Sequence, residues 1–145
     1  MMNKWFKILA ALFVIGLIAA FLVFKFVYNK PHTDYSKVKP AFTLTAEELF
    51  SSFKGDKGAS DTKYTGQVIE ITGNVSQIEH TDSLTIAVFI LEEGMFGDEG
   101  IRCTILSDYY EILSSINDGD QITIKGYCTG YNEVDIILEK CSIIN

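Results

Sequence analysis

The stretch GQVIEITGNVSQIE, residues 66–79, decides the fold. Ile69, Ile71 and Val75 recur with a period of two, and Gly73 takes the inward position between the last two of them, so the pattern predicts a long β-strand. Glycine has no Cβ and therefore tolerates the bulge or sharp coil that lets one strand serve two sheet surfaces. We expect this strand to turn the corner of a small barrel.

Four more strands and one helix are predicted downstream, from alternating or continuous apolar residues and from three-to-four residue spacing. They are strands over residues 84–91, 101–106, 121–127 and 134–144, and a helix from Ser107 or Asp108 to about Ile116. The segment EEGMFGDEG, residues 92–100, predicts a solvated acidic loop that exposes Met95 and Phe96. Its carboxylates are out of register for a calcium loop, so no metal site is predicted there.

A further helix is predicted before the first strand. Thr45 and Glu48 fit a capping box, in which the threonine oxygen accepts from a free amide and the glutamate reaches back. The apolar stripe that follows is expected to pack on the barrel, and it consists of Ala46, Leu49, Phe50 and Phe53. Gly55 and Gly58 weaken the continuation of this helix toward Tyr64.

The order of these elements predicts the fold class. Strand, strand, strand, helix, strand, strand is the order of the OB-fold, a five-stranded Greek-key barrel in which a helix between the third and fourth strands closes one end. We therefore expect a mainly β domain, a five-stranded OB-fold barrel with an extra N-terminal helix. It would occupy residues 41–145.

The chain begins with an apolar segment that predicts a transmembrane helix. The uncharged run from Ile8 to Phe24 would rise roughly 25 Å as a helix, and Trp5 and Tyr28 bracket it as interfacial aromatics. A cleaved signal peptide is the alternative, but no suitable cleavage site follows the run. We expect an uncleaved signal anchor over residues 1–28, followed by a polar linker over residues 29–40.

Charge is distributed unevenly along the chain. The net charge is −7, but the residues from Ala41 onward hold 18 acidic and 6 basic side chains, a net charge of −12. A field of that sign repels phosphate backbones unless a local basic groove overrides it. Lysines lie on both sides of the apolar segment, so their balance does not fix the topology.

Five stretches carry a resemblance to a known family: PAFTLTAEELFSSF at 40–53, KYTGQVIEITGNV at 63–75, GIRCTI at 100–105, GDQITIKGYCTGY at 119–131 and DIILEKCSI at 135–143. With these stretches the sequence resembles the tRNA_anti-like group of OB-fold proteins, membrane-attached bacterial proteins of undefined role. The resemblance implies no catalytic residues and no cofactor. Together with the tether and the uncleaved anchor, it favours a single-pass protein of a bacterial inner membrane whose domain lies outside the cytoplasm.

The main functional hypothesis is a non-catalytic binding module for a protein or another component of the cell envelope. OB-fold barrels bind ligands through one strand face and the loops beside it. The candidate ligand-binding residues are Arg102, Tyr127, Tyr131, Asn132, Met95 and Phe96. Single-stranded nucleic-acid binding is the alternative, with bases stacked on Phe89, Tyr127 and Tyr131 beside Arg102. The acidic balance of the domain disfavours it.

An enzyme is not predicted, because the chain shows neither a nucleophile beside a base nor an oxyanion or metal motif. Three widely spaced cysteines, Cys103, Cys128 and Cys141, form no zinc pattern. In strands they are small buried hydrophobes more often than redox centres. One disulfide among them would fit an extracytoplasmic domain.

Overall fold

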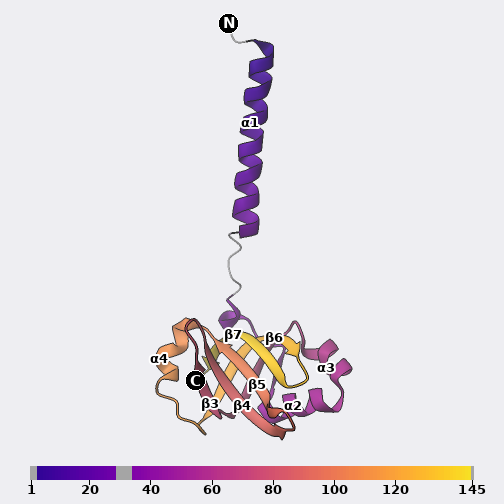
Figure 1. The fold of residues 1–145 in the computed structure, drawn as a ribbon, viewed down its shortest axis with the longest axis vertical. Coiled ribbons are helices and arrows are strands. Elements are labelled where there is room, and N and C mark those ends of the chain that lie inside the picture. The colour runs from indigo at the N-terminus through magenta and orange to yellow at the C-terminus, as the bar shows by residue number, and fades with distance from the viewer. Residues whose placement is uncertain (1–2, 29–33, 145) are drawn as a thin grey trace. The chain divides into compact units, whose positions relative to one another are not determined.

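The computed structural model describes residues 3–28 and 34–144, and the chain divides into two compact units between residues 33 and 34 (Figure 1). Parts of the expected anchor, linker and domain lie outside the described residues, namely residues 1–2, 29–33 and 145.

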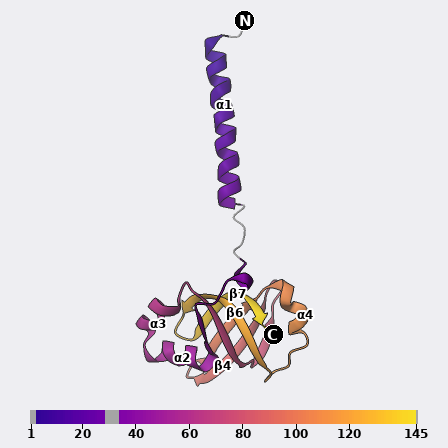
Figure 2. The same cartoon turned by 180° about the vertical axis from the view of Figure 1, so that it is seen from behind.

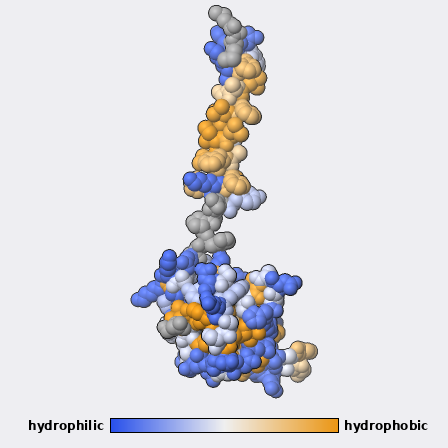
Figure 3. Space-filling model, turned by 90° about the vertical axis from the view of Figure 1, so that its left-hand side faces the viewer, coloured by the Kyte–Doolittle hydropathy of each residue, from blue (hydrophilic) through white to orange (hydrophobic). Residues whose placement is uncertain are grey.

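The first unit is a single helix. α1, Lys4–Val23, continues as a π-helical segment, Phe24–Tyr28, and none of its side chains is buried. On the face drawn in Figure 3 its middle is apolar and both of its ends are hydrophilic. Its length and composition suit a membrane span and equally a signal sequence.

The second unit is built on a mixed sheet of seven strands. They are β1 (Phe42–Thr45), β2 (Val68–Asn74), β3 (Gln77–His80), β4 (Thr85–Gly94), β5 (Gly97–Ile105), β6 (Gln121–Tyr131) and β7 (Asp135–Ile144), in the spatial order β1-β2-β6-β7-β5-β4-β3. The pairs β1–β2 and β5–β7 are parallel and the other pairs are antiparallel. The second unit is thus mainly β, as the sequence predicts. It also contains a short strand, β1, that the sequence did not predict and that pairs in parallel with β2.

The decisive stretch forms β2 and β3, which are separated only by Val75 and Ser76. β2 pairs with β6, whereas β3 pairs with β4. At the junction the Val75 N–H donates to the Asp120 carbonyl at 2.9 Å, and the Ser76 N–H donates to the Val88 carbonyl at 2.8 Å. The chain therefore changes its hydrogen-bonding partner strand within two residues, close to the predicted glycine.

Gly73 is required by a close approach. A Cβ at this position would lie 2.8 Å from the Ala46 Cβ and 3.3 Å from Cδ1 of Phe89. Carbon atoms in van der Waals contact are about 3.5–4.0 Å apart. The absent side chain lets the first residue of α2 and the core ring meet over the strand.

Three helices accompany the sheet, with α2 and α3 on one side of the strands and α4 on the other (Figures 1 and 2). They are α2 (Ala46–Gly55), α3 (Lys57–Tyr64) and α4 (Tyr110–Leu113), the last preceded by a 3₁₀ turn, Ser107–Tyr109. The predicted capping box at the start of α2 is confirmed, with both of its hydrogen bonds present. The predicted apolar stripe of α2 is buried, whereas the predicted helix over residues 107–116 is shorter than expected.

The expected loop over residues 92–100 is wrong, because β4 and β5 continue through it as a hairpin. Glu92 pairs with Glu99, Glu93 with Asp98 and Gly94 with Gly97. Only Met95 and Phe96 form the turn. Lys54 of α2 contacts both carboxylates of the first acidic pair and so offsets part of their repulsion from outside the segment.

The core lies between the curved sheet and the helices. Its largest fully buried side chains include Phe53, Phe89, Leu49, Ile69, Ile71, Ile101, Ile124, Ile136 and Leu138. Cys103, Cys128 and Cys141 are buried there as free thiols. Burial raises the pKa of the Cys128 thiol to about 11 and that of Cys141 well above its ordinary value. These thiols are packing residues in this structure.

Candidate binding surface

Four strands present a second row of side chains away from the core. On β4 and β5, Ala87, Phe89, Ile101 and Cys103 point inward and are fully buried, so their neighbours in sequence point outward. We call this outward side the outer face, and its residues are Glu79 of β3, Ile86, Val88 and Ile90 of β4, Arg102 and Thr104 of β5, and Asp135 and Ile137 of β7.

Arg102 lies at the centre of the outer face, opposite Val88 on one side and Ile137 on the other. Its guanidinium forms an ion pair with the Glu79 carboxylate, across β4. Val88, below this ion pair, is only 3% exposed. The single arginine of the chain is therefore already engaged by a carboxylate of its own sheet.

Asp135, the first residue of β7, adds a carboxylate to the outer face next to the turn between β6 and β7. Its Oδ1 accepts a hydrogen bond from the Gly100 N–H at 3.2 Å. Partial burial raises the pKa of this carboxyl, although Arg102 and the Gly100 amide act in the opposite direction, and Glu79 and Glu99 add to the increase. The carboxyl group thus lies in a partly dehydrated environment.

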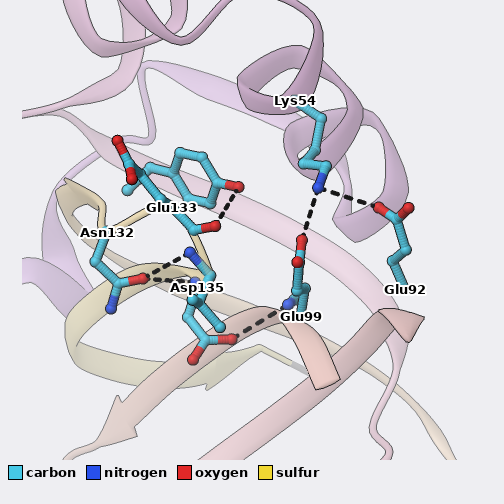
Figure 4. A network of polar contacts seen from close by, with 9 residues as sticks. Lys54, Glu92, Glu99, Asn132, Glu133 and Asp135 are labelled. Atoms are coloured by element: carbon cyan, nitrogen blue, oxygen red, sulfur yellow. Dashed lines mark hydrogen bonds and ion pairs between the residues drawn. The ribbon is translucent and has the colours of Figure 1, made fainter. Parts of the chain in front are cut away.

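Tyr131 is the last residue of β6, and Asn132 follows it in the turn to β7, where Figure 4 shows it beside Asp135. The Asn132 Oδ1 accepts from the N–H groups of Val134 and Asp135, at 3.0 and 2.7 Å. The Tyr131 hydroxyl donates to the Glu133 carbonyl at 3.0 Å, and Glu133 has a φ of 76°. These polar atoms therefore hold a strained turn in place, and they leave the side-chain NH2 of Asn132 as a donor and the Tyr131 hydroxyl oxygen as an acceptor for a ligand.

The Tyr131 ring joins this turn to the helices. Its centroid lies 5.6 Å from that of Phe53, and Lys57 Nζ lies 5.8 Å from the ring. Beside the ring is an open cavity of about 310 Å³, lined by Asp61, Thr65, Thr129, Gly130, Tyr131, Asn132 and Ile137. The cavity adjoins the outer face through Ile137.

Lys54 connects α2 to the base of the β4–β5 hairpin (Figure 4). Its Nζ lies 2.7 Å from Glu99 Oε2 and 3.4 Å from Glu92 Oε2. The hydrogen bond to Glu99 raises the pKa of Lys54. This contact fixes the hairpin against the helix, and at its tip Met95 and Phe96 are 92% and 97% exposed.

The structure brings together most of the predicted ligand-binding residues. Arg102 is on the outer face, Tyr131 and Asn132 are on the adjacent turn, and Met95 and Phe96 end the hairpin. Phe89 does not belong to this group, because it is fully buried and its ring cannot stack on a ligand. Residues 84–91 are apolar on both faces, so the sequence alone did not reveal which side Phe89 takes.

Tyr127 is also separate from the candidate surface, because residues 34–38 cover it. Tyr35, in a 3₁₀ turn over Tyr35–Lys37, stacks on Tyr127 with ring centroids 5.2 Å apart and planes 18° apart. Lys125, 7% exposed, donates to the carbonyl of Ser36. The end of the expected linker is thus packed on β6 and β7 instead of being extended.

Four charged residues of the surface were missed in the sequence analysis: Glu79, Asp135, Lys54 and Lys57. Their partners are distant in sequence, so no local pattern signals them. Within residues 3–28 and 34–144, no three His, Cys, Asp or Glu side chains are placed to hold a metal ion.

Comparisons with known proteins identify relatives of the chain. The model of the tRNA_anti-like family matches residues 1–143. A Klebsiella pneumoniae crystal structure, named a "putative nucleic acid-binding lipoprotein", is 12% identical with a TM-score of 0.55, and the alignment covers 80% of this chain and all of that one. At that identity the likeness shows a shared fold.

Two further solved structures match with lower TM-scores. OBody AM3L15 and OBody AM1L10, each bound to hen egg-white lysozyme, are 14% identical with TM-scores of 0.40 and 0.39. The alignments cover 57% of this chain and 80% and 84% of theirs. No match was found among curated protein sequences.

Proposed function

Because the chain belongs to the tRNA_anti-like family, we propose that it is a membrane-anchored, non-catalytic OB-fold module that binds a protein or another envelope component. The family and the structural relative are described as binding proteins, not as enzymes.

The strand pairings support an OB-fold barrel. β3 is one end of the sheet order and β2 lies next to β1 at the other end, yet β2 and β3 are adjacent in the chain. Counted as one bent strand, they pair with β4 at one end and β6 at the other, and the order closes through β5 and β7. Five strands result, with α4 between the third and fourth, as in the OB-fold. β1 and α2–α3 are additions to it.

Anchoring by α1 is the second part of the proposal. The family model includes this helix, and no cysteine follows it before Cys103, so a lipid-modified cysteine just behind the apolar run is disfavoured. We place the domain outside the cytoplasm. An impermeant maleimide tests this on intact cells that carry Lys39→Cys, because Lys39 is exposed whereas the native thiols are buried. Labelling only after lysis would place the domain inside.

A protein or neutral ligand is favoured because the cations of the candidate surface are paired with carboxylates of the same domain. Arg102 pairs with Glu79, Lys54 with Glu92 and Glu99, and Lys57 with Glu133. Glu93, Asp98 and Asp135 have no ion pair within the described part of the chain, so the surface remains acidic around its half-buried aliphatic residues. Such a surface suits cationic or apolar groups of a ligand better than phosphates.

The test is site-specific crosslinking from the outer face in the full chain, with Thr104 replaced by the photo-crosslinking residue benzoylphenylalanine. We expect a discrete adduct with an envelope protein or polymer. The same residue at Asp108, in the 3₁₀ turn beyond the end of β5, is the control. Equal and diffuse adducts from both positions would contradict a binding role for the outer face.

Nucleic-acid binding is the second candidate, and the name of the Klebsiella relative favours it. Labelled single-stranded DNA and RNA are titrated with residues 34–145 at low salt, where phosphate attraction is greatest. The acidic outer face leads us to expect no saturable anisotropy change. Binding that weakens with salt and is lost in Arg102→Met would establish this candidate instead.

A further inference from the structure

The tip of the β4–β5 hairpin exposes two large apolar side chains side by side. Met95 and Phe96 form the turn between the paired residues Gly94 and Gly97 and are almost completely exposed. Tight hairpin turns usually carry asparagine, aspartate or glycine at these positions. Side chains that the turn does not require and that do not join the core need another explanation.

The strands directly below the tip carry like charges opposite one another. Glu92 faces Glu99 and Glu93 faces Asp98, an arrangement that destabilises an antiparallel pair. Lys54 compensates the first pair, but the ion pairs of the described residues include none with Glu93 or Asp98. Two local preferences are thus broken at one place, as is typical of functional sites.

The hairpin is also held in position before any partner arrives. Lys54 bonds its base to α2, and Lys54 Nζ lies 5.7 Å from the Phe50 ring on the same helix. A rigid element loses less conformational entropy on binding than a mobile loop does. The tip therefore has the properties of a preformed anchor.

We propose that Met95 and Phe96 insert into an apolar pocket of a partner protein whose rim carries lysine or arginine side chains that pair with Glu93 and Asp98. The inference rests on the proposed binding function and specifies the partner. Aromatic and methionine anchors in a pocket with a polar rim are typical of protein interfaces. Anionic lipid or nucleic acid would be repelled by the same carboxylates.

The experiment uses the full chain in cells of its source organism, with Phe96 replaced by benzoylphenylalanine. We expect a discrete protein adduct whose crosslinked peptide lies in an apolar pocket with basic neighbours. Adding Glu93→Lys should reduce its yield tenfold or more. The same change should leave the thermal unfolding midpoint unchanged or higher, because the new ammonium group faces Asp98 across the hairpin. Asp82→Lys is the matched control, because Asp82 precedes β4 at its other end.

The outcomes separate this inference from the proposed function. An adduct from position 104 with none from position 96 would overturn the anchor but keep the binding module. An absence of adducts from both positions would overturn both. Lipid adducts at position 96, or binding of the full chain to added phosphatidylglycerol vesicles that requires Phe96, would identify a membrane contact and refute a protein pocket. A protein adduct unaffected by Glu93→Lys would refute the basic rim.

Discussion

Gly73→Ala is the sharpest test of how the decisive strand is packed. The added Cβ would lie 2.8 Å from the Ala46 Cβ, roughly 1 Å inside carbon–carbon contact. Ala46 cannot easily withdraw, because it is fully buried and follows Thr45, whose side chain and backbone are bonded to Glu48. Overpacking of this kind costs about 1–3 kcal/mol of the free energy of unfolding, and hence about 4–12 °C in the midpoint temperature.

The assay is urea and thermal unfolding of the full chain in detergent, followed by circular dichroism. Ala46→Gly alone should cost about 0.5–1 kcal/mol through helix propensity. If the Cβ overlap causes the loss, adding Gly73→Ala to that variant should cost little more, and the double-mutant cycle measures the coupling. Gly55→Ala is the control, because no atom lies within 4 Å of its added Cβ.

The reasoning would be refuted if Gly73→Ala stayed within about 0.5 kcal/mol of the wild type or if Ala46→Gly failed to rescue it. Either result would mean that the close approach over the strand does not constrain the fold.

Three further predictions concern the surface, the core and the linker. Burial raises the pKa of Asp135, so the stability that the protonated carboxyl contributes below pH 3.8 is lost as the pH rises through the folded pKa. Asp135→Asn should therefore be more stable than wild type at pH 7 in urea titrations. The difference between the two proteins should vanish at pH 3. The pKa of Cys128 is about 11 against an ordinary 9.0, so the free energy of unfolding should fall by up to about 3 kcal/mol between pH 9 and 11. Cys128→Ala should reduce that alkaline loss. An equal loss in the variant would mean that Cys128 is not the group that titrates. Tyr35→Ala should cost about 1 kcal/mol by removing the stack on Tyr127 and should make Tyr127 reactive to iodination, whereas unchanged reactivity would mean that the ring is not covered.

The elements that the sequence predicted are those whose signals are local. The alternation of Ile69, Ile71 and Val75 and the capping box of Thr45 and Glu48 involve only near neighbours in the chain. A period of two or a side chain that reaches three residues back is visible without the tertiary structure. These elements were therefore placed correctly, and their buried and exposed sides were as expected.

The elements that the sequence missed depend on distant partners. Residues 92–100 look like a loop because they are acidic and rich in glycine, yet they form a hairpin in which Lys54, about forty residues earlier, pairs with Glu92 and Glu99 and offsets part of their repulsion. The sequence predicted that Tyr127 is accessible to a ligand, because nothing near it in the chain indicates that the Tyr35 ring stacks on it. Tertiary contacts overrode local composition in both places.

Net charge alone is a weak guide to the ligand of this domain, because what a ligand meets is the set of charges that remain unpaired. The domain's net charge of −12 would still allow nucleic-acid binding if Arg102, Lys54 and Lys57 formed a free basic groove. Instead each of these cations is bonded to a carboxylate, and Glu93 and Asp98, which have no ion pair within the described residues, lie beside the exposed hairpin tip. A phosphate would have to displace Glu79 from Arg102 and then remain among other carboxylates, whereas a lysine or arginine of a partner would relieve the repulsion between Glu93 and Asp98.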